Sequence, residues 1–310
     1  MIMKNRSDTS LRPGESAPRI THHASRVTHH APPAFTLVEL LVVISIIAIL
    51  ASLLLPVLNR VKIKAQVKKS QMEAGTIVNA IHSYEADYSK FPVSSVGPQT
   101  ATSEAAKNSS DFTYGTVGVS CVGPGGPITG PPWNGFATPK SAVYQPITTA
   151  GSAYQTNNAE VMAVLLDMEY WVNSASPNQP TINAGHVKNP QKTTYLNASM
   201  SGNWTSPGIG LDGTYRDVWG NPYIITIDLN FDDKARDAFY GTQSVSADPS
   251  DGINTPKRGL NGLIPRVIGG NTFYEANSPV MVWSPGPDKM IDPNTSATTG
   301  ANKDNIISWK

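Results

Sequence analysis

The sequence has little charge and almost no cysteine. Only 15% of its 310 residues are Asp, Glu, Lys or Arg, and 24 basic side chains nearly balance 23 acidic ones. A binding surface that neutralises many phosphates needs an excess of basic side chains, so nucleic acid is not expected as a partner. The single cysteine, Cys121, excludes an intramolecular disulfide. A folded domain in this chain therefore has to rely on its hydrophobic core.

Common catalytic motifs are also missing. The sequence contains no G-x-S-x-G, no Walker loop, no H-E-x-x-H and no paired cysteine ligands. Four of the six histidines lie in an approximate repeat within the first thirty residues, which leaves only His82 and His186 in the rest of the chain. Cys121 lies in a Gly- and Pro-rich stretch without an adjacent basic residue, unlike a catalytic thiol. We therefore expect no enzyme activity.

One long apolar run stands out. From Leu40 to Leu58 every residue is uncharged and most are aliphatic. As a helix this run is about 30 Å long, which matches the hydrocarbon core of a membrane. The only ionisable side chain between Phe35 and Leu58 is Glu39. A carboxylate at membrane depth costs about 2.5 to 3.5 kcal/mol, so Glu39 either needs a partner or lies near the interface of an ordinary anchor.

The start of this run has a distinctive sequence. Ala34-Phe-Thr-Leu-Val-Glu39-Leu resembles the processing site of type IV pilins and type II secretion pseudopilins, with Ala34 where the family usually has Gly. The resemblance implies that a prepilin peptidase cleaves between Ala34 and Phe35 and methylates the new amino group of Phe35. Residues 1–34 are then a leader peptide, and 35–58 are the transmembrane and assembly helix.

The same resemblance gives roles to two residues of the span. If helices stack side by side in a filament, the ammonium group of one Phe35 can neutralise the Glu39 carboxylate of a neighbour. Pro56 lacks a backbone N–H and clashes with the preceding turn, so we expect a bend or a locally unwound segment there. Both Glu39 and Pro56 are therefore expected to act in assembly.

Topology and partners follow from the resemblance. Five cations precede the span and five follow it closely, so the positive-inside rule does not decide the orientation. The family implies a single pass through the inner membrane with a cytoplasmic leader and a periplasmic C-terminal domain. It also implies a prepilin peptidase, other pseudopilins, an inner-membrane platform protein and an assembly ATPase as partners, and self-assembly into a periplasmic or surface filament.

The segment 59–90 continues the helix with an amphipathic pattern. Apolar residues recur at spacings of three, four and seven, which places them on one stripe. They are Val67, Ala74, Ile77, Ile81, Tyr84 and Tyr88. The pattern predicts one helix of roughly fifty residues that ends before Phe91-Pro92, because a residue that precedes Pro disfavours the helical region. We expect its apolar stripe to pack on a sheet.

Residues 91–310 are expected to form one exported globular domain. Val93–Asn157 is rich in Gly, Pro and Ser and is predicted to be loop, with aromatic side chains that cap the surface or meet a partner. Phe112, Tyr114 and Trp133 are among these aromatics. Asn158–Val172 has helical spacing, with Asn157 or Asn158 as N-cap.

Three later segments have the composition of strands. Residues 224–230 alternate apolar and polar side chains, which is typical of a strand covered on one face. Residues 279–284 and 305–309 are short runs of β-forming residues. The turn at Trp219-Gly-Asn-Pro222 resembles the one at which pseudopilin sheets begin. The expected fold is α+β and pilin-like, with a long N-terminal helix packed on a small antiparallel sheet and with long loops.

A loop with three aspartates separates the last two predicted strands. In the major pseudopilins the corresponding loop carries calcium, which binds six to eight oxygen ligands. The resemblance therefore implies calcium at Asp288, Asp292 and Asp304, and the alternative is that these acids cap turns.

The sequence thus predicts a structural subunit of a type II secretion pseudopilus or a related type IV pilus-like filament. The alternative is a minor pilin that acts as a ligand-binding, DNA-binding or adhesive module. The acidic balance after Lys90 counts against DNA. A membrane-anchored hydrolase is a third class, but no motif supports it.

Overall fold

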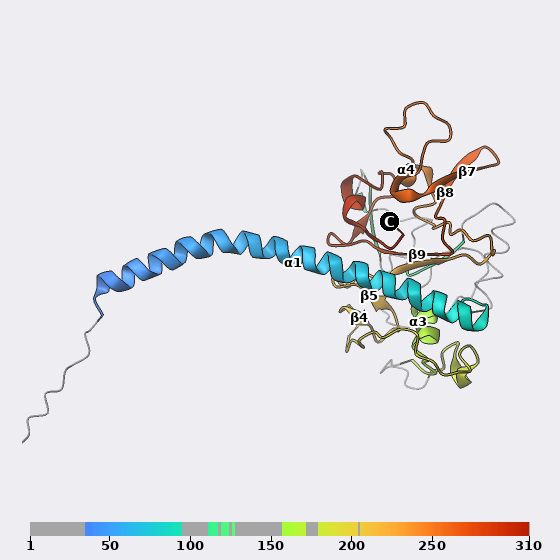
Figure 1. The fold of residues 1–310 in the computed structure, drawn as a ribbon, viewed down its shortest axis with the longest axis horizontal. Helices are drawn as coiled ribbons and strands as arrows, with labels where there is room; N and C mark the ends of the chain where they lie inside the picture. Colours follow the sequence, from blue (N-terminus) through green and yellow to red (C-terminus); the bar gives the residue numbers. More distant parts are fainter. Residues whose placement is uncertain are drawn as a thin grey trace, which may run out of the picture. The chain divides into compact units, whose positions relative to one another are not determined.

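The structure is a computed structural model that describes residues 35–94, 111–116, 119–123, 126–127, 157–171, 179–203 and 205–309 (Figure 1). It contains one long helix, shorter helices and antiparallel sheets, which confirms the mixed α+β class. The chain divides into two compact units, 1–55 and 56–310. The predicted leader, including Ala34, lies outside the described residues.

Helix α1, Leu37–Tyr88, contains 52 residues and includes Pro56. Its C-terminal end agrees with the predicted end before Phe91-Pro92. The helix continues through Pro56, so local unwinding there is absent from the isolated chain. Pro56 removes one backbone donor and thus one helical hydrogen bond, and the turns on both sides remain helical. The unwinding implied for a filament stays a prediction.

The main sheet has four strands in the order β1-β6-β9-β11, and all neighbours are antiparallel. They are β1 Phe112–Tyr114, β6 Ile224–Ile227, β9 Val280–Ser284 and β11 Ile306–Ile307. The last three confirm the predicted strands, which prove shorter than expected for β6 and β11.

Strand β1 corrects the prediction that residues 93–157 are all loop. Phe112 and Tyr114 are 1% and 0% exposed and belong to the core, so they do not cap the surface. The three-residue strand pairs with β6 in the register Phe112↔Ile227. A strand of this length is too short to show a period of two in a Gly- and Pro-rich stretch.

The second half of α1 packs on the sheet, as its apolar stripe predicts. Ala74, Ile77, Ile81 and Tyr84 are buried in one hydrophobic cluster with residues of β1, β6 and β9. A second cluster, around Trp283, contains Ile224 of β6 and Met281 of β9. All four residues of β6 are buried. The expectation that this strand is covered on one face only is therefore wrong.

The second cluster is built from the C-terminal half of the chain and Val119. The hairpin of β7, Ile264–Ile268, and β8, Asn271–Glu275, was not predicted from the sequence.

Asp237 is fully buried beside Trp283, and its carboxylate accepts hydrogen bonds from Thr226, Trp283 and two backbone N–H groups. Burial raises the pKa of Asp237, and these bonds partly oppose that effect.

The remaining elements are short. They are β2 Ser120–Gly123, β3 Gly126–Pro127, α3 Ala159–Leu165, η1 Ala184–His186, β4 Gly208–Ile209, β5 Tyr215–Arg216, α4 Gln243–Ser246, η2 Leu260–Gly262, β10 Met290–Ile291 and η3 Gly300–Asp304. Cys121 lies in β2 and pairs in register with Ile291 of β10, so the expectation that it lies in a loop is wrong.

Helix α3 is shorter than the predicted 158–172 helix, and all seven of its residues are buried. Asn158 occupies the N-cap position, but its side chain does not cap the helix. Its amide instead donates to the carbonyl oxygens of Tyr215 and Tyr223 at 3.0 and 2.7 Å and accepts from the Tyr215 N–H at 2.8 Å. Asn158 thereby links α3 to β5 and to the residue before β6.

Candidate functional site

The predicted processing and assembly residues lie at the start of α1. Phe35 precedes the helix and is 78% exposed. Thr36 and Glu39 form a capping box, in which the Thr36 N–H and hydroxyl both donate to Glu39 Oε2, at 2.8 and 2.7 Å. The Glu39 N–H donates in return to Thr36 Oγ1 at 3.2 Å. These bonds satisfy backbone donors that have no partner within the helix.

The capping box gives Glu39 a role that sequence reasoning missed. Thr36-Leu-Val-Glu39 has the spacing of a capping box, so this role could have been predicted. Both bonds from Thr36 end on Oε2, and the carboxylate stays exposed. Oε1 takes part in neither bond. Capping and pairing with a neighbouring subunit are therefore geometrically compatible.

The first half of α1 exposes nearly all of its apolar side chains. An 18-residue window has a mean hydropathy of 3.0, and no part of it is buried against the rest of the described structure. Ser45 and Ser52 each donate to a carbonyl oxygen one turn earlier, both at 2.7 Å. The helix is long and apolar enough to cross a membrane, and its serine hydroxyls are satisfied internally. An exposed apolar surface of this extent is typical of a site that contacts a membrane or another protein.

The turn that resembles the pseudopilin sheet entry is organised by Asp217. This residue is completely buried, and its Oδ1 accepts the N–H groups of Trp219 and Asn221 at 2.9 and 2.8 Å. Its Oδ2 accepts the Asn221 amide at 2.9 Å and the Ser284 hydroxyl at 2.8 Å. Burial raises the pKa of Asp217, while these four bonds stabilise its charged form.

Asn221 extends this network to the loop after β9. Its amide donates to the carbonyl oxygen of Gly286 at 2.8 Å. The turn 217–222 and the loop that begins at Ser284 are thus bonded through Asp217 and Asn221. These are the two stretches of the C-terminal domain whose sequences resemble those of pseudopilins, and in the structure they are joined by hydrogen bonds.

The same turn is connected to the helix. Tyr223, which follows it directly, is buried, and its hydroxyl donates to Glu73 Oε2 on α1 at 2.7 Å. Burial and the Glu73 charge raise the pKa of Tyr223, so the hydroxyl keeps its proton and remains a donor. The second half of α1 is therefore held to the sheet by a polar contact as well as by the core.

The three aspartates of the predicted calcium loop do not form one set. Asp292 uses both carboxylate oxygens within its own turn, with the Asn294 N–H and the Thr295 hydroxyl. Across the described ranges, no group of three His, Cys, Asp or Glu side chains is arranged to hold a metal ion. Asp292 therefore takes the turn-capping role that was the alternative.

Asp288 and Asp304 lie close to one another. Burial and the Asp304 charge raise the pKa of Asp288, and burial raises that of Asp304. Asp304 Oδ1 is buried without a hydrogen-bond partner among the residues that the structure describes. Gly286 has a positive φ of 77°, and a Cβ there would overlap the Asp304 carbonyl oxygen, which makes Gly necessary. The pair brings two carboxylates into one region of the loop, and Asp288 Oδ1 also accepts the Met290 N–H at 2.9 Å.

Comparison of the chain with protein-family models, curated proteins and solved structures finds no match. Its function is therefore inferred from its own residues.

Proposed function

We propose that this chain is a pilin-like structural subunit that assembles into a filament through its N-terminal helix. The proposal is supported chiefly by helix α1, whose first half exposes its apolar side chains and whose second half belongs to the core of an α+β domain. Such a helix can be stored in a membrane and then packed against copies of itself, because both environments cover the same apolar surface.

In this proposal, cleavage before Phe35 creates an ammonium group four residues from Glu39. Within one helix the Glu39 carboxylate already accepts bonds from Thr36 on Oε2. The ammonium group of a neighbouring Phe35 meets the same carboxylate and neutralises it. A buried charge without a partner is strongly unfavourable, so the pair favours the subunit stagger that brings the two groups together.

Within the pilin-like class, we favour a type II secretion pseudopilin over a surface pilus subunit. Support comes from the hydrogen-bonded contact between the 217–222 turn and the loop after β9. The proposed partners are a prepilin peptidase, other pseudopilins, a platform protein and an assembly ATPase. In this proposal the N-terminal modification is carried out on the chain by another enzyme, and the chain needs no catalytic site of its own.

The proposal includes a calcium ion at Asp288 and Asp304, with backbone carbonyl oxygens as further ligands. Calcium would neutralise two carboxylates that burial makes costly to ionise, and Asp304 Oδ1 is a buried oxygen that lacks a partner in the described structure. Asp292 is left out because both of its oxygens are used.

Calcium is expected to raise the melting temperature of the chain. A ligand at one hundred times its Kd stabilises the folded state by about 2.7 kcal/mol. Thermal melting in excess calcium and in excess chelator measures this difference. The Asp304→Asn variant is expected to lose the calcium effect, whereas Asp292→Asn is expected to keep it. Equal melting temperatures in calcium and chelator for the unmodified chain would exclude the ion.

The filament proposal is tested by co-expressing the full chain with a prepilin peptidase and a pseudopilus assembly apparatus that lacks its own major pseudopilin. We expect fibres that contain this chain in the sheared fraction, detected by electron microscopy with antibody labelling. The same cells without the assembly ATPase are the control, and they are expected to retain the chain in the membrane. Recovery of only monomeric, membrane-bound chain in both strains would contradict the proposal.

A further inference from the structure

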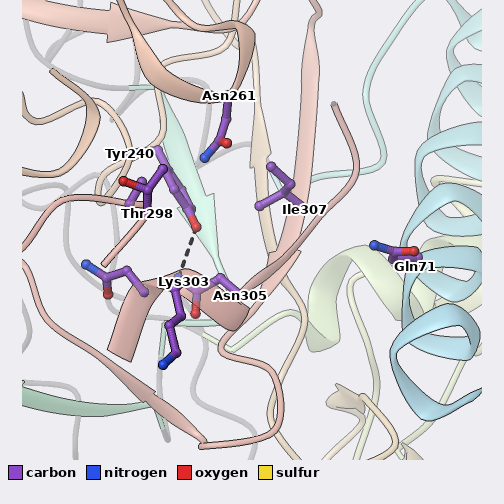
Figure 2. Close-up of a pocket in the computed structure, with 9 residues that line it drawn as sticks. Gln71, Tyr240, Asn261, Thr298, Lys303, Asn305 and Ile307 are labelled. Carbon is purple, nitrogen blue, oxygen red and sulfur yellow. Dashed lines mark hydrogen bonds between the residues drawn. The ribbon is translucent and has the colours of Figure 1, made fainter. Parts of the chain in front are cut away.

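A polar pocket lies on the globular unit, and its lining includes none of the residues assigned above to processing and assembly. Its volume is about 230 Å³, and it is bounded by residues of α1, η2, η3, β11 and the chain around them (Figure 2). The lining residues are Gln71, Tyr240, Asn261, Ala297, Thr298, Asn302, Lys303, Asn305 and Ile307. The lining contains no carboxylate, and Lys303 is its single charged residue.

Two groups in the wall have unused hydrogen-bonding capacity. The Asn305 amide donates to the Tyr240 hydroxyl oxygen at 3.0 Å, the contact drawn in Figure 2. Because that oxygen accepts, the hydroxyl proton of Tyr240 remains available for a ligand. Burial raises the pKa of Tyr240, which keeps this proton in place at neutral pH. Asn305 Oδ1 is buried and has no donor in the described part of the chain.

The wall is held in shape by Asn302, which is 1% exposed. Its amide donates to the carbonyl oxygens of Asp292 and Thr295, both at 2.7 Å, and its oxygen accepts the Asp292 N–H at 2.8 Å. These bonds use the Asn302 side chain internally and fix η3 against the preceding turn. Tyr240 is likewise fixed, because its ring packs edge-on against Trp283 and Trp309.

The rim adds exposed or partly exposed groups of mixed type. Gln71 and Asn261 contribute amides, Thr298 contributes a hydroxyl and Lys303 contributes an ammonium group. Ala297 and Ile307 are the only apolar residues of the lining. A ligand that fits this pocket therefore needs many small donors and acceptors, and a hydrophobic ligand would leave them unsatisfied.

We propose that this pocket binds one sugar residue of a glycan. A sugar hydroxyl can donate to Asn305 Oδ1 while a neighbouring oxygen accepts from the Tyr240 hydroxyl. A simple carboxylate such as acetate offers no donor for Asn305 Oδ1 and would leave that buried oxygen unpaired. A sugar ring carries hydrogen-bond donors and acceptors on adjacent atoms. The rim amides of Gln71 and Asn261 can donate to a sugar oxygen or accept from a sugar hydroxyl.

The test uses the full chain in a detergent without sugar headgroups, applied to an array of neutral hexose, uronic-acid and sialic-acid oligosaccharides. We expect retention of glycans from this array without a preference for acidic ones, because the exposed Lys303 charge lies within electrostatic range of the Asp288 and Asp304 carboxylates. Tyr240→Phe and Asn305→Ser are each expected to weaken binding at least tenfold. Asn271→Ala, which changes an exposed asparagine at the tip of the β7–β8 hairpin, is expected to bind as the unmodified chain does.

A second variant separates loss of binding from loss of folding. Asn261 has a positive φ of 56°, which Gly adopts readily, so Asn261→Gly removes only the rim amide. We expect it to melt as the unmodified chain does and to bind about threefold more weakly. The proposal is overturned if no glycan is retained, or if binding persists unchanged in both Tyr240→Phe and Asn305→Ser. It is also overturned if acetate displaces the bound glycan as well as the matching free sugar does.

Discussion

Glu39→Gln is expected to abolish incorporation into filaments and to leave membrane insertion intact. Glutamine at this position can still accept the Thr36 N–H, because capping boxes use Glu and Gln alike. It lacks the negative charge that pairs with the ammonium group of a neighbouring Phe35. The amount of chain in the sheared fibre fraction, compared with the amount in the membrane fraction, measures this effect.

Thr36→Ala is the matched control for this experiment. It removes the hydroxyl of the capping box and destabilises the start of α1 by about 1 kcal/mol, but it keeps the Glu39 charge. We expect this variant to assemble. If Thr36→Ala fails as severely as Glu39→Gln, the loss of assembly is not specific to the Glu39 charge, because Thr36→Ala keeps that charge. If Glu39→Gln forms normal fibres, charge pairing between subunits is not required.

Asp217→Ala is expected to lower the free energy of unfolding of the globular unit by about 3 kcal/mol. The carboxylate is completely buried and accepts four hydrogen bonds, two from backbone N–H groups and one each from the side chains of Asn221 and Ser284. Its removal leaves these buried donors without an acceptor, and each unsatisfied donor costs about 1 to 3 kcal/mol. Relief of the desolvated charge offsets part of the loss.

Urea unfolding of the full chain, followed by tryptophan fluorescence, measures this loss. Asp233→Asn is the control, since Asp233 is exposed at a positive φ of 61° that asparagine tolerates. We expect the control to change the free energy of unfolding by less than about 0.5 kcal/mol. Equal stability of the Asp217 and Asp233 variants would mean that the turn does not hold the loop after β9.

The parts of the fold that could be predicted are those with a long or regular pattern. Helix α1 has an apolar run, an amphipathic stripe and a terminating Phe91-Pro92, so its C-terminal end and its packing face followed from the sequence. Strand β9 was predicted from a compact run of β-forming residues. Strand β1 was missed because three residues show no period, and its place in the sheet depends on pairing with β6, more than a hundred residues later.

The β7–β8 hairpin was missed although its signal is present. Gly269 and Gly270 join the two strands, and both have positive φ angles, of 57° and 85°. A Gly-Gly pair between two runs of β-forming residues is a standard hairpin signal. The β7–β8 hairpin could therefore have been predicted from the sequence.

The candidate sites likewise divide into those with a local sequence pattern and those formed by residues far apart in the sequence. The Thr36–Glu39 capping box is local and could have been read from its spacing, whereas the bond from Ser284 to Asp217 joins residues 67 positions apart. No sequence pattern gives such a pairing. The pocket around Tyr240 and Asn305 was likewise missed, because its residues come from five separate parts of the chain.

The central claim is that the chain is processed before Phe35 and joins other copies through the new N-terminus. Intact-mass spectrometry of the membrane-extracted chain, from strains with and without a prepilin peptidase, tests it most directly. We predict a mass equal to residues 35–310 plus one methyl group in the first strain and a chain that retains residues 1–34 in the second. A single mass that includes residues 1–34 in both strains would contradict the account.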